Sequence, residues 1–269
     1  MNIPIQTKPF SLRSCIQRSL EIIYRNFRLL IGIFIITHIP IYLFRLLLEQ
    51  YAAKSIYPLS QITGSGVGAL SISIMIYILN YLTLAFTILA YAFISETTIL
   101  GKQVSFSVAM RHAASIFLKM VMTLIPGFLL LFFLIALVLS GSSLSCFLGI
   151  VIIPLCFFIG IFLFVVIYTI ALRDVYGFQA YAYSWNLING NWGTFITGYL
   201  ALALAVLFLS SPILIPALLL SYSIATRIPV IGDIPADILA IWLLVGFTII
   251  YLNVDYLKNT PIPTINSES

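Results

Sequence analysis

The side chains that most often do chemistry are few in this sequence and are not grouped. The chain has 2 histidines, His38 and His112, and 3 cysteines, Cys15, Cys146 and Cys156, with no HExxH, CxxC or DxD pattern around them. We interpret the cysteines as small buried hydrophobic residues. The sequence therefore predicts no metal site, no cofactor and no enzymatic activity.

Two other patterns match catalytic or ligand-binding motifs only in part. The glycine-rich run at 64–68 offers backbone N–H groups, but it lacks the Gly-Lys-Ser/Thr ending of a phosphate loop. The serines lack the Gly-x-Ser-x-Gly frame and a neighbouring base. We favour a flexible connector for the glycine-rich run.

Polar side chains within apolar segments are better candidates for a functional site, because polar and charged groups are costly in hydrocarbon. His38 lies inside the first apolar run, two residues before Pro40, and Asn80 lies near the middle of the second. A proton-relay or gating histidine is one interpretation of His38, and a neutral histidine bonded to a neighbouring helix is the other. For Asn80 the alternatives are an interhelical hydrogen bond and a substrate contact.

The elements that position these residues are membrane-spanning helices. Of 269 residues, 62% are hydrophobic and 8% are charged, against about 25% charged in ordinary soluble domains. The apolar runs are long enough to cross a hydrocarbon layer of about 30 Å and are apolar on every side, which excludes a barrel of alternating strands. The sequence predicts an all-α, polytopic membrane protein whose six spans lie near 29–48, 69–94, 120–139, 146–170, 195–221 and 237–255.

The distribution of basic residues predicts the orientation of these spans. Most Lys and Arg residues precede the first span or lie between the second and third, and such segments remain in the cytoplasm. We therefore expect a cytoplasmic amphipathic segment at 1–28, a cytoplasmic tail at 256–269 and a location in the bacterial inner membrane. A mitochondrial origin is the alternative, since residues 10–28 are Arg-rich and amphipathic.

Two segments outside the spans have the period of an amphipathic helix lying in the headgroup layer, where anionic lipid would bind. In the first, one face carries Leu12, Ile16, Leu20, Ile23 and Phe27, and the other carries Arg18, Glu21, Arg25 and Arg28, with Arg13 at the boundary. In the second, before the third span, Arg111, Ser115 and Lys119 share one face. The candidate membrane-surface residues are Arg13, Arg18, Arg25, Arg28, Arg111 and Lys119.

These segments also indicate an internal repeat. A third segment, 176–192, precedes the fifth span, and its Ser184, Asn191 and Trp192 match Ser19, Asn26 and Phe27 in spacing. The interpretation is three units of one interfacial helix and a two-span hairpin, with matched positions about 94 and about 71 residues apart. The alternative is that any hairpin protein has basic, amphipathic flanks on its cytoplasmic side.

Prolines and charges at the span ends complete the pattern. Pro212 and Pro216 fall in the fifth span and predict a kink there, or a broken helix that lines a cavity. Glu96, Arg173 and Asp255 lie at predicted cytoplasmic ends, where we expect them to mark the exit of a helix from lipid.

The stretches 19–27 and 171–174 with 184–192 resemble the membrane region fused to glycerophosphoryl diester phosphodiesterases and related stand-alone bacterial membrane proteins of the YciC-like family. The resemblance implies the six-span fold and an inner-membrane location. The stand-alone members have no established activity, and the phosphodiesterase chemistry belongs to a separate soluble domain.

Two functional hypotheses follow. The first is a non-enzymatic membrane protein that acts through lipid contacts, with anionic lipids as the expected partners, or through contacts with other membrane proteins, in envelope maintenance. The second is a small-solute or lipid transporter, which the repeats, the kinked span and His38 would suit. Nothing in the pattern indicates nucleic-acid binding.

Overall fold

The computed structural model describes residues 11–63, 67–139, 143–225 and 234–259, and in this part of the chain every regular element is an α-helix. Side chains are described for 11–47, 78–131, 133–134, 151–208 and 238–258. The helices are α1 (Leu12–Thr63), α2 (Val67–Ile99), α3 (Phe106–Leu139), α4 (Ser143–Arg173), α5 (Phe178–Ile188), α6 (Trp192–Ala225) and α7 (Ile234–Asn259).

The chain is a polytopic membrane protein, as predicted. Among the described residues, five helices are long and apolar enough to cross a membrane, and α5 together with the described part of α6 makes a sixth candidate span, although this pair is bent by 86°. Helix α6 continues through positions 212 and 216 as one element. The side chains of Pro212 and Pro216, and with them the predicted cavity, lie outside the described residues. Helix α7 continues to Asn259, past the predicted span end at 255.

Each predicted amphipathic segment is helical, and we call the ranges 12–25, 106–119 and 178–188 the lead-in helices. The first is separated from its span by a kink at Asn26, whose φ of −111° and ψ of 17° are not helical. The third ends at a turn that contains Gly190, with φ of 84°, a conformation that favours glycine. The second lead-in helix is the first part of α3 and continues without a break into the rest of that helix.

Asparagine side chains stabilise both breaks in the same way. Asn26 Nδ2 donates to the carbonyl of Ile22 at 3.0 Å, and Asn191 Nδ2 donates to the carbonyl of Leu187 at 3.1 Å. Each bond pairs a carbonyl near the end of a lead-in helix, where intrahelical partners are missing. The sequence match between Ser19–Phe27 and Ser184–Trp192 therefore corresponds to a shared local structure.

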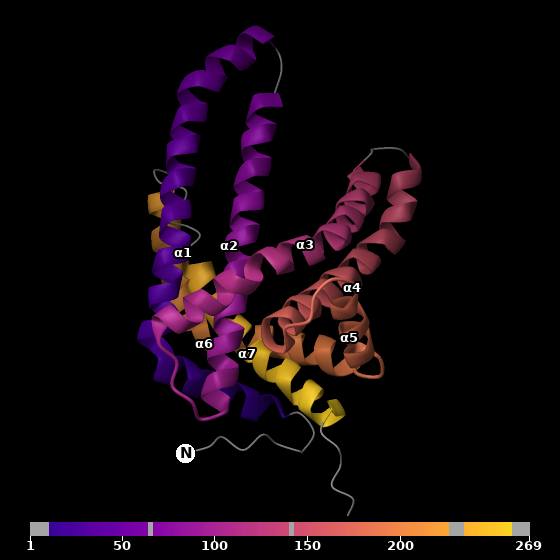
Figure 1. Ribbon diagram of the computed structural model, residues 1–269. Coiled ribbons are helices and arrows are strands. Elements are labelled where there is room, and N and C mark those ends of the chain that lie inside the picture. The colour runs from indigo at the N-terminus through magenta and orange to yellow at the C-terminus, as the bar shows by residue number, and fades with distance from the viewer. Residues whose placement is uncertain (1–10, 64–66, 140–142, 226–233, 260–269) are drawn as a thin grey trace, which may run out of the picture.

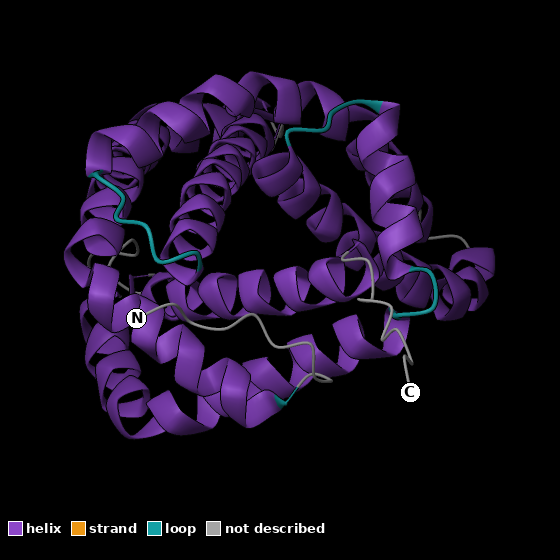
Figure 2. Ribbon diagram, turned by 60° about the horizontal axis from the view of Figure 1, so that its bottom comes forward, coloured by secondary structure: helices purple, strands orange, loops and turns teal. Residues whose placement is uncertain are grey.

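The hairpins are arranged cyclically. Helices α1 and α2, α3 and α4, and α6 and α7 pack as pairs, and each lead-in helix belongs to an element that packs against the preceding hairpin: α3 on α2, α5 on α4, and α1 on α7. The beginning of α1 and the end of α7 lie at one end of the molecule, while the first two hairpins diverge toward the other (Figure 1). We call the end where α1 begins and α7 ends the lead-in end. Viewed from this end, the helices form a closed ring (Figure 2).

Burial follows the predicted repeat. At five matched positions in each unit the residue is buried, and the three sets are Cys15, Ser19, Ile22, Leu30 and Ile33; Ala109, Ala113, Ile116, Leu124 and Gly127; and Ala180, Ser184, Leu187, Phe195 and Gly198. Residues of these sets from the lead-in helices are mostly small. They form a helix face of their own. The predicted apolar stripe lies on a different face, where Leu20 and Phe27 remain exposed. Leu20 and Phe27 thus stay available to lipid, whereas Ile16 and Ile23 of the same stripe pack against the core.

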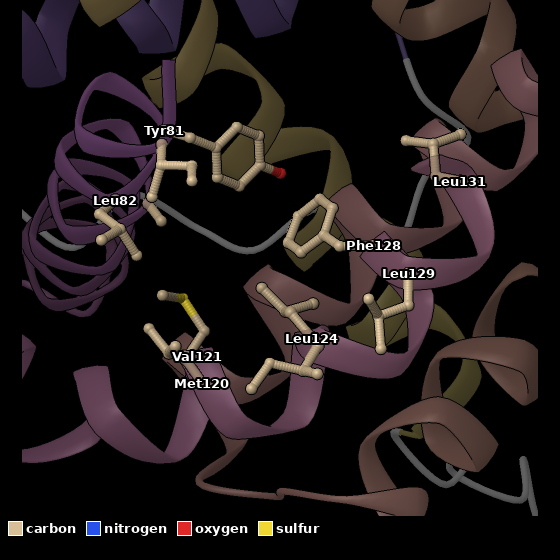
Figure 3. Close-up of a pocket in the computed structure, with 11 residues that line it drawn as sticks. Tyr81, Leu82, Met120, Val121, Leu124, Phe128, Leu129 and Leu131 are labelled. Atoms are coloured by element: carbon tan, nitrogen blue, oxygen red, sulfur yellow. The ribbon is translucent and has the colours of Figure 1, made fainter. Parts of the chain in front are cut away.

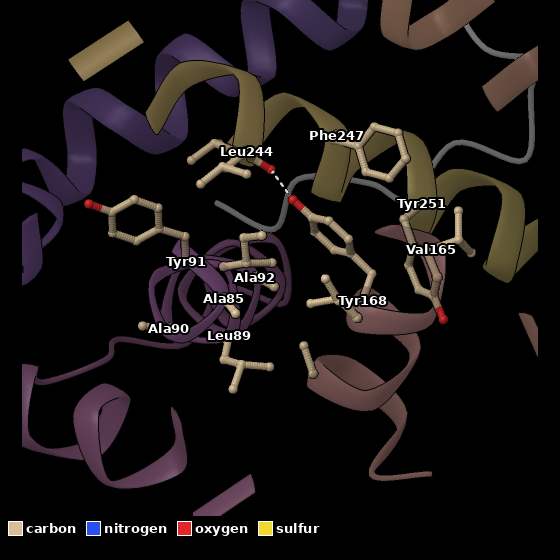
Figure 4. Packing of buried hydrophobic residues seen from close by; sticks show 14 of the residues in the cluster. Ala85, Leu89, Ala90, Tyr91, Ala92, Val165, Tyr168, Leu244, Phe247 and Tyr251 are labelled. Carbon is tan, nitrogen blue, oxygen red and sulfur yellow. Dashed lines mark hydrogen bonds between the residues drawn. The ribbon is translucent and has the colours of Figure 1, made fainter. Parts of the chain in front are cut away.

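The second helix of each unit forms the centre of the fold. Tyr91 of α2, Tyr168 of α4 and Tyr251 of α7 are fully buried (Figure 4). Tyr91 Oη donates to the carbonyl of Leu30 and Tyr168 Oη to that of Leu244, both at 2.9 Å. These bonds pair phenolic hydroxyls that would otherwise be costly in an apolar interior.

Candidate functional site

The two predicted intramembrane polar residues do not converge. His38 is partly buried on α1, where its Nδ1 lies 2.9 Å from Thr37 Oγ1 and its ring stacks on Phe34 with centroids 4.5 Å apart. Thr37 meets Thr87 of α2 at 3.4 Å. Asn80 lies roughly 10 Å further along α2 from Thr87, at about 1.5 Å per residue. The two residues therefore do not form one polar site.

The predicted membrane-surface residues differ in their surroundings. Arg25 pairs with Glu21 at 2.7 Å, and Lys119 Nζ donates to Tyr176 Oη at 2.9 Å. Arg18 is partly buried. The remaining three, Arg13, Arg28 and Arg111, are exposed, and none of them has an ion-pair partner among the described residues. These three arginines keep their donors available for an external anion.

Exposed apolar side chains accompany these arginines on the lead-in helices. Tyr24, in the first lead-in helix, is 87% exposed, and Phe27, just after the kink that ends this helix, is 57% exposed. On α5, which lacks arginine, Phe178 is 88% exposed and Trp185 56%. Arginine beside aromatic and aliphatic side chains is the composition of a helix in the headgroup layer.

A charged cluster at the lead-in end joins the second helices of all three units. Arg173 of α4 lies 2.7 Å from Glu96 of α2 and 2.5 Å from Asp255 of α7. Tyr183 of α5 donates a hydrogen bond to the same Asp255. The Asp255 side chain is 4% exposed and that of Arg173 22%, so the cluster is largely removed from water.

The sequence pattern did not predict this cluster. Glu96, Arg173 and Asp255 were each interpreted singly, as markers of a helix end. Their positions in the sequence did carry a signal. Each lies near the same end of the second helix of its unit, and the charge of Arg173 is opposite to that of Glu96 and Asp255. A repeat closed into a ring brings these three positions together.

His112 and Thr123 add further connections between the units. His112 Nε2 lies 3.2 Å from the carbonyl of Ala171 within the second unit, and its ring stacks on Phe93 of the first unit with centroids 4.1 Å apart. Thr123 Oγ1 accepts a bond from the N–H of Gly177 at 2.9 Å. Among the described residues, no group of three or more His, Cys, Asp or Glu side chains is placed to hold a metal ion.

An apolar crevice separates the first and second units away from the lead-in end. It is lined by side chains from Ile78 to Ala85 on α2 and from Met120 to Leu131 on α3, and its volume is about 600 Å³. The rings of Tyr81 and Phe128 meet edge to face across it, with centroids 4.6 Å apart (Figure 3). Its α2 wall belongs to the middle of a predicted span, so the crevice lies at membrane depth.

A smaller crevice occupies the corresponding place between the second and third units. Its volume is about 270 Å³, and its lining includes Phe164 of α4, Tyr199 of α6 and Phe247 of α7. Tyr199 is the residue that matches Phe128 in the repeat. Both crevices are thus features of the interface between successive units.

Comparison with known proteins gives no family for this chain. No protein-family model matches it, and no curated protein and no solved structure matches it either.

Proposed function

We propose that this chain is a non-enzymatic protein of the bacterial inner membrane that binds anionic phospholipid along its lead-in helices, on the cytoplasmic side. The observation that carries the proposal is the exposure of Arg13, Arg28 and Arg111 without ion-pair partners among the described residues, beside exposed aromatic and aliphatic side chains. A guanidinium held at the headgroup level binds a phosphate in a bidentate manner. The resemblance of residues 19–27 to the YciC-like family accords with the inner-membrane location in this proposal.

The experiment compares lipid retention by the full chain and by a variant with Arg13→Gln and Arg28→Gln. Each protein is reconstituted into nanodiscs of phosphatidylglycerol and phosphatidylcholine, and the lipids retained after mild extraction are counted by native mass spectrometry. One basic residue near an anionic surface contributes about 1 kcal/mol. We therefore expect the enrichment of phosphatidylglycerol to fall by roughly tenfold or more in the double variant.

Arg25→Gln is the matched control, because Arg25 is already paired with Glu21. It should reduce the enrichment less than either single substitution at Arg13 or Arg28. Equal retention of both lipids by the unsubstituted chain would refute the proposed function.

A lipid transporter is the second candidate, and the two membrane-depth crevices between units favour it. Proteoliposomes that contain a fluorescent phospholipid should then show faster loss of inner-leaflet fluorescence to dithionite than protein-free vesicles. An identical rate would leave the binding protein as the remaining proposal.

A further inference from the structure

The crevice between α2 and α3 differs from an ordinary binding pocket for a polar small molecule. Such pockets place a few polar groups around the ligand to orient it. Here the lining side chains are hydrocarbon apart from the Tyr81 hydroxyl and the Met120 sulfur, and Ile125 and Leu129 on the α3 wall are exposed at its edge. An apolar chain that enters from the side, out of the bilayer, fits this environment.

We propose that this crevice holds one acyl chain of a phospholipid whose anionic headgroup lies at Arg111. The proposal rests on the proposed function in lipid binding and assigns it to one lipid at one place. It makes the interface between the first two units a lipid-binding site.

One face of α3 connects Arg111 to the crevice. Arg111, Leu118, Met122, Ile125 and Leu129 recur at helical spacing, and all five are exposed. From Arg111 to Met120, where the crevice lining begins, the helix rises about 14 Å at 1.5 Å per residue. One leaflet of the hydrocarbon layer is roughly 15 Å thick. An acyl chain extends about the thickness of one leaflet, so a chain whose phosphate is bound at Arg111 is long enough to reach the crevice.

The charge at this position is specific to the second unit. Arg111 has no ion-pair partner among the described residues, whereas Lys119, eight residues further along α3, bonds to Tyr176. In the third unit the position that matches Arg111 is Ala182, which has no charge. The smaller crevice beside that unit thus provides an internal comparison that lacks the headgroup ligand.

The experiment uses phosphatidylglycerol and phosphatidylcholine that carry a diazirine in the acyl chain. The full chain is reconstituted into nanodiscs with each lipid, irradiated and digested, and the cross-linked residues are mapped by mass spectrometry. Cross-links should concentrate on the crevice walls, at residues 78–85 and 120–131. With phosphatidylglycerol the yield there should exceed the yield with phosphatidylcholine by about fivefold, and Arg111→Gln should abolish this difference.

Val121→Trp tests occupancy of the crevice directly, because Val121 lines it. The indole should displace the chain and lower the cross-linking yield at the crevice by fivefold or more. Leu130→Trp is the matched control, because Leu130 is 50% exposed, does not line the crevice and is not on the helix face that connects Arg111 to it. It should leave the yield at the crevice unchanged.

Other outcomes would overturn the proposal and are distinguishable from failure of the proposed function. Cross-links spread evenly over all lipid-exposed residues of the unsubstituted chain refute the crevice site, whatever the folding of the Trp variant. If phosphatidylglycerol is enriched through Arg13 and Arg28 but Arg111→Gln has no effect, the crevice proposal fails and the proposed function stands.

Discussion

The lead-in end and the interfaces further into the membrane are built from the same helices in opposite ways. At the lead-in end, Glu96, Arg173 and Asp255 join α2, α4 and α7 by ion pairs. Deeper in the membrane, α2 and α3 separate around an apolar crevice, and α4 separates from α6 in a corresponding way. One region is closed by polar contacts and the other remains open to lipid.

This difference has a physical reason. Between helices in lipid there is little hydrophobic driving force, because lipid tails are as apolar as leucine. Contact between units therefore depends on close packing or on polar bonds, and polar bonds are cheapest near the headgroups, where water solvates any unpaired group. Polar contacts therefore join the three units near the headgroups, and hydrocarbon can fill the gaps between units deeper in the membrane.

Arg173→Gln, at the lead-in end, should have the largest effect on the stability of the fold. It leaves the carboxylates of Glu96 and Asp255 without their counter-charge in a largely buried place. We expect a loss of about 3 kcal/mol in the free energy of unfolding, the low end of the range for removing one partner of a buried pair. Unfolding in mixed micelles of sodium dodecyl sulfate, followed by circular dichroism, measures this loss. Arg25→Gln, in the exposed pair with Glu21, should cost less than about 1 kcal/mol, and an equal cost for both would contradict the assignment.

Leu163→Ala should have the next largest effect on stability. It compares truncation at a packed interface with truncation at the open crevice. Leu163 is buried between α3 and α4, where its Cδ2 would lie 2.4 Å from a Cβ added at Gly127. Its truncation leaves a cavity and should cost about 2 kcal/mol. Val121→Ala, on the crevice wall, should cost less than about 1 kcal/mol, because lipid can fill the space. A thermal melt in the same nanodiscs compares the two, and a larger cost for Val121→Ala would show that the crevice is closed.

Tyr168→Phe should have the smallest effect. It removes the hydrogen bond from the Tyr168 hydroxyl to the carbonyl of Leu244 without changing the packing of the ring. Hydrogen bonds between helices in membranes contribute about 0.6 kcal/mol on average, so a loss of about this size is expected in the micelle assay. Tyr81→Phe is the control, because the Tyr81 hydroxyl has no hydrogen-bond partner among the described residues. If Tyr168→Phe and Tyr81→Phe are equally stable, the Tyr168 hydrogen bond contributes no stability, and polar contacts stabilise the fold at the lead-in end alone.

Periodicity and hydropathy predicted much of this fold. The spans, the first amphipathic segment and the spacing of the repeats follow from the distribution of apolar and charged residues along the chain. The match between Ser19–Phe27 and Ser184–Trp192 predicted a similarity that the fold contains, while the bonds of Asn26 and Asn191 to the backbone were not predicted. Local patterns of this kind are determined by residues one helical turn apart and need no knowledge of the tertiary structure.

The sequence by itself thus determined that the chain crosses a membrane as helices and where the interfacial segments lie. The tertiary structure decided which faces of the helices meet, because hydrophobicity does not distinguish a side turned to lipid from a side turned to protein. The buried face of Cys15, Ser19 and Ile22 became evident only in this way. It also decided that Glu96, Arg173 and Asp255 form one cluster, since residues so far apart in sequence meet only when the three units close into a ring.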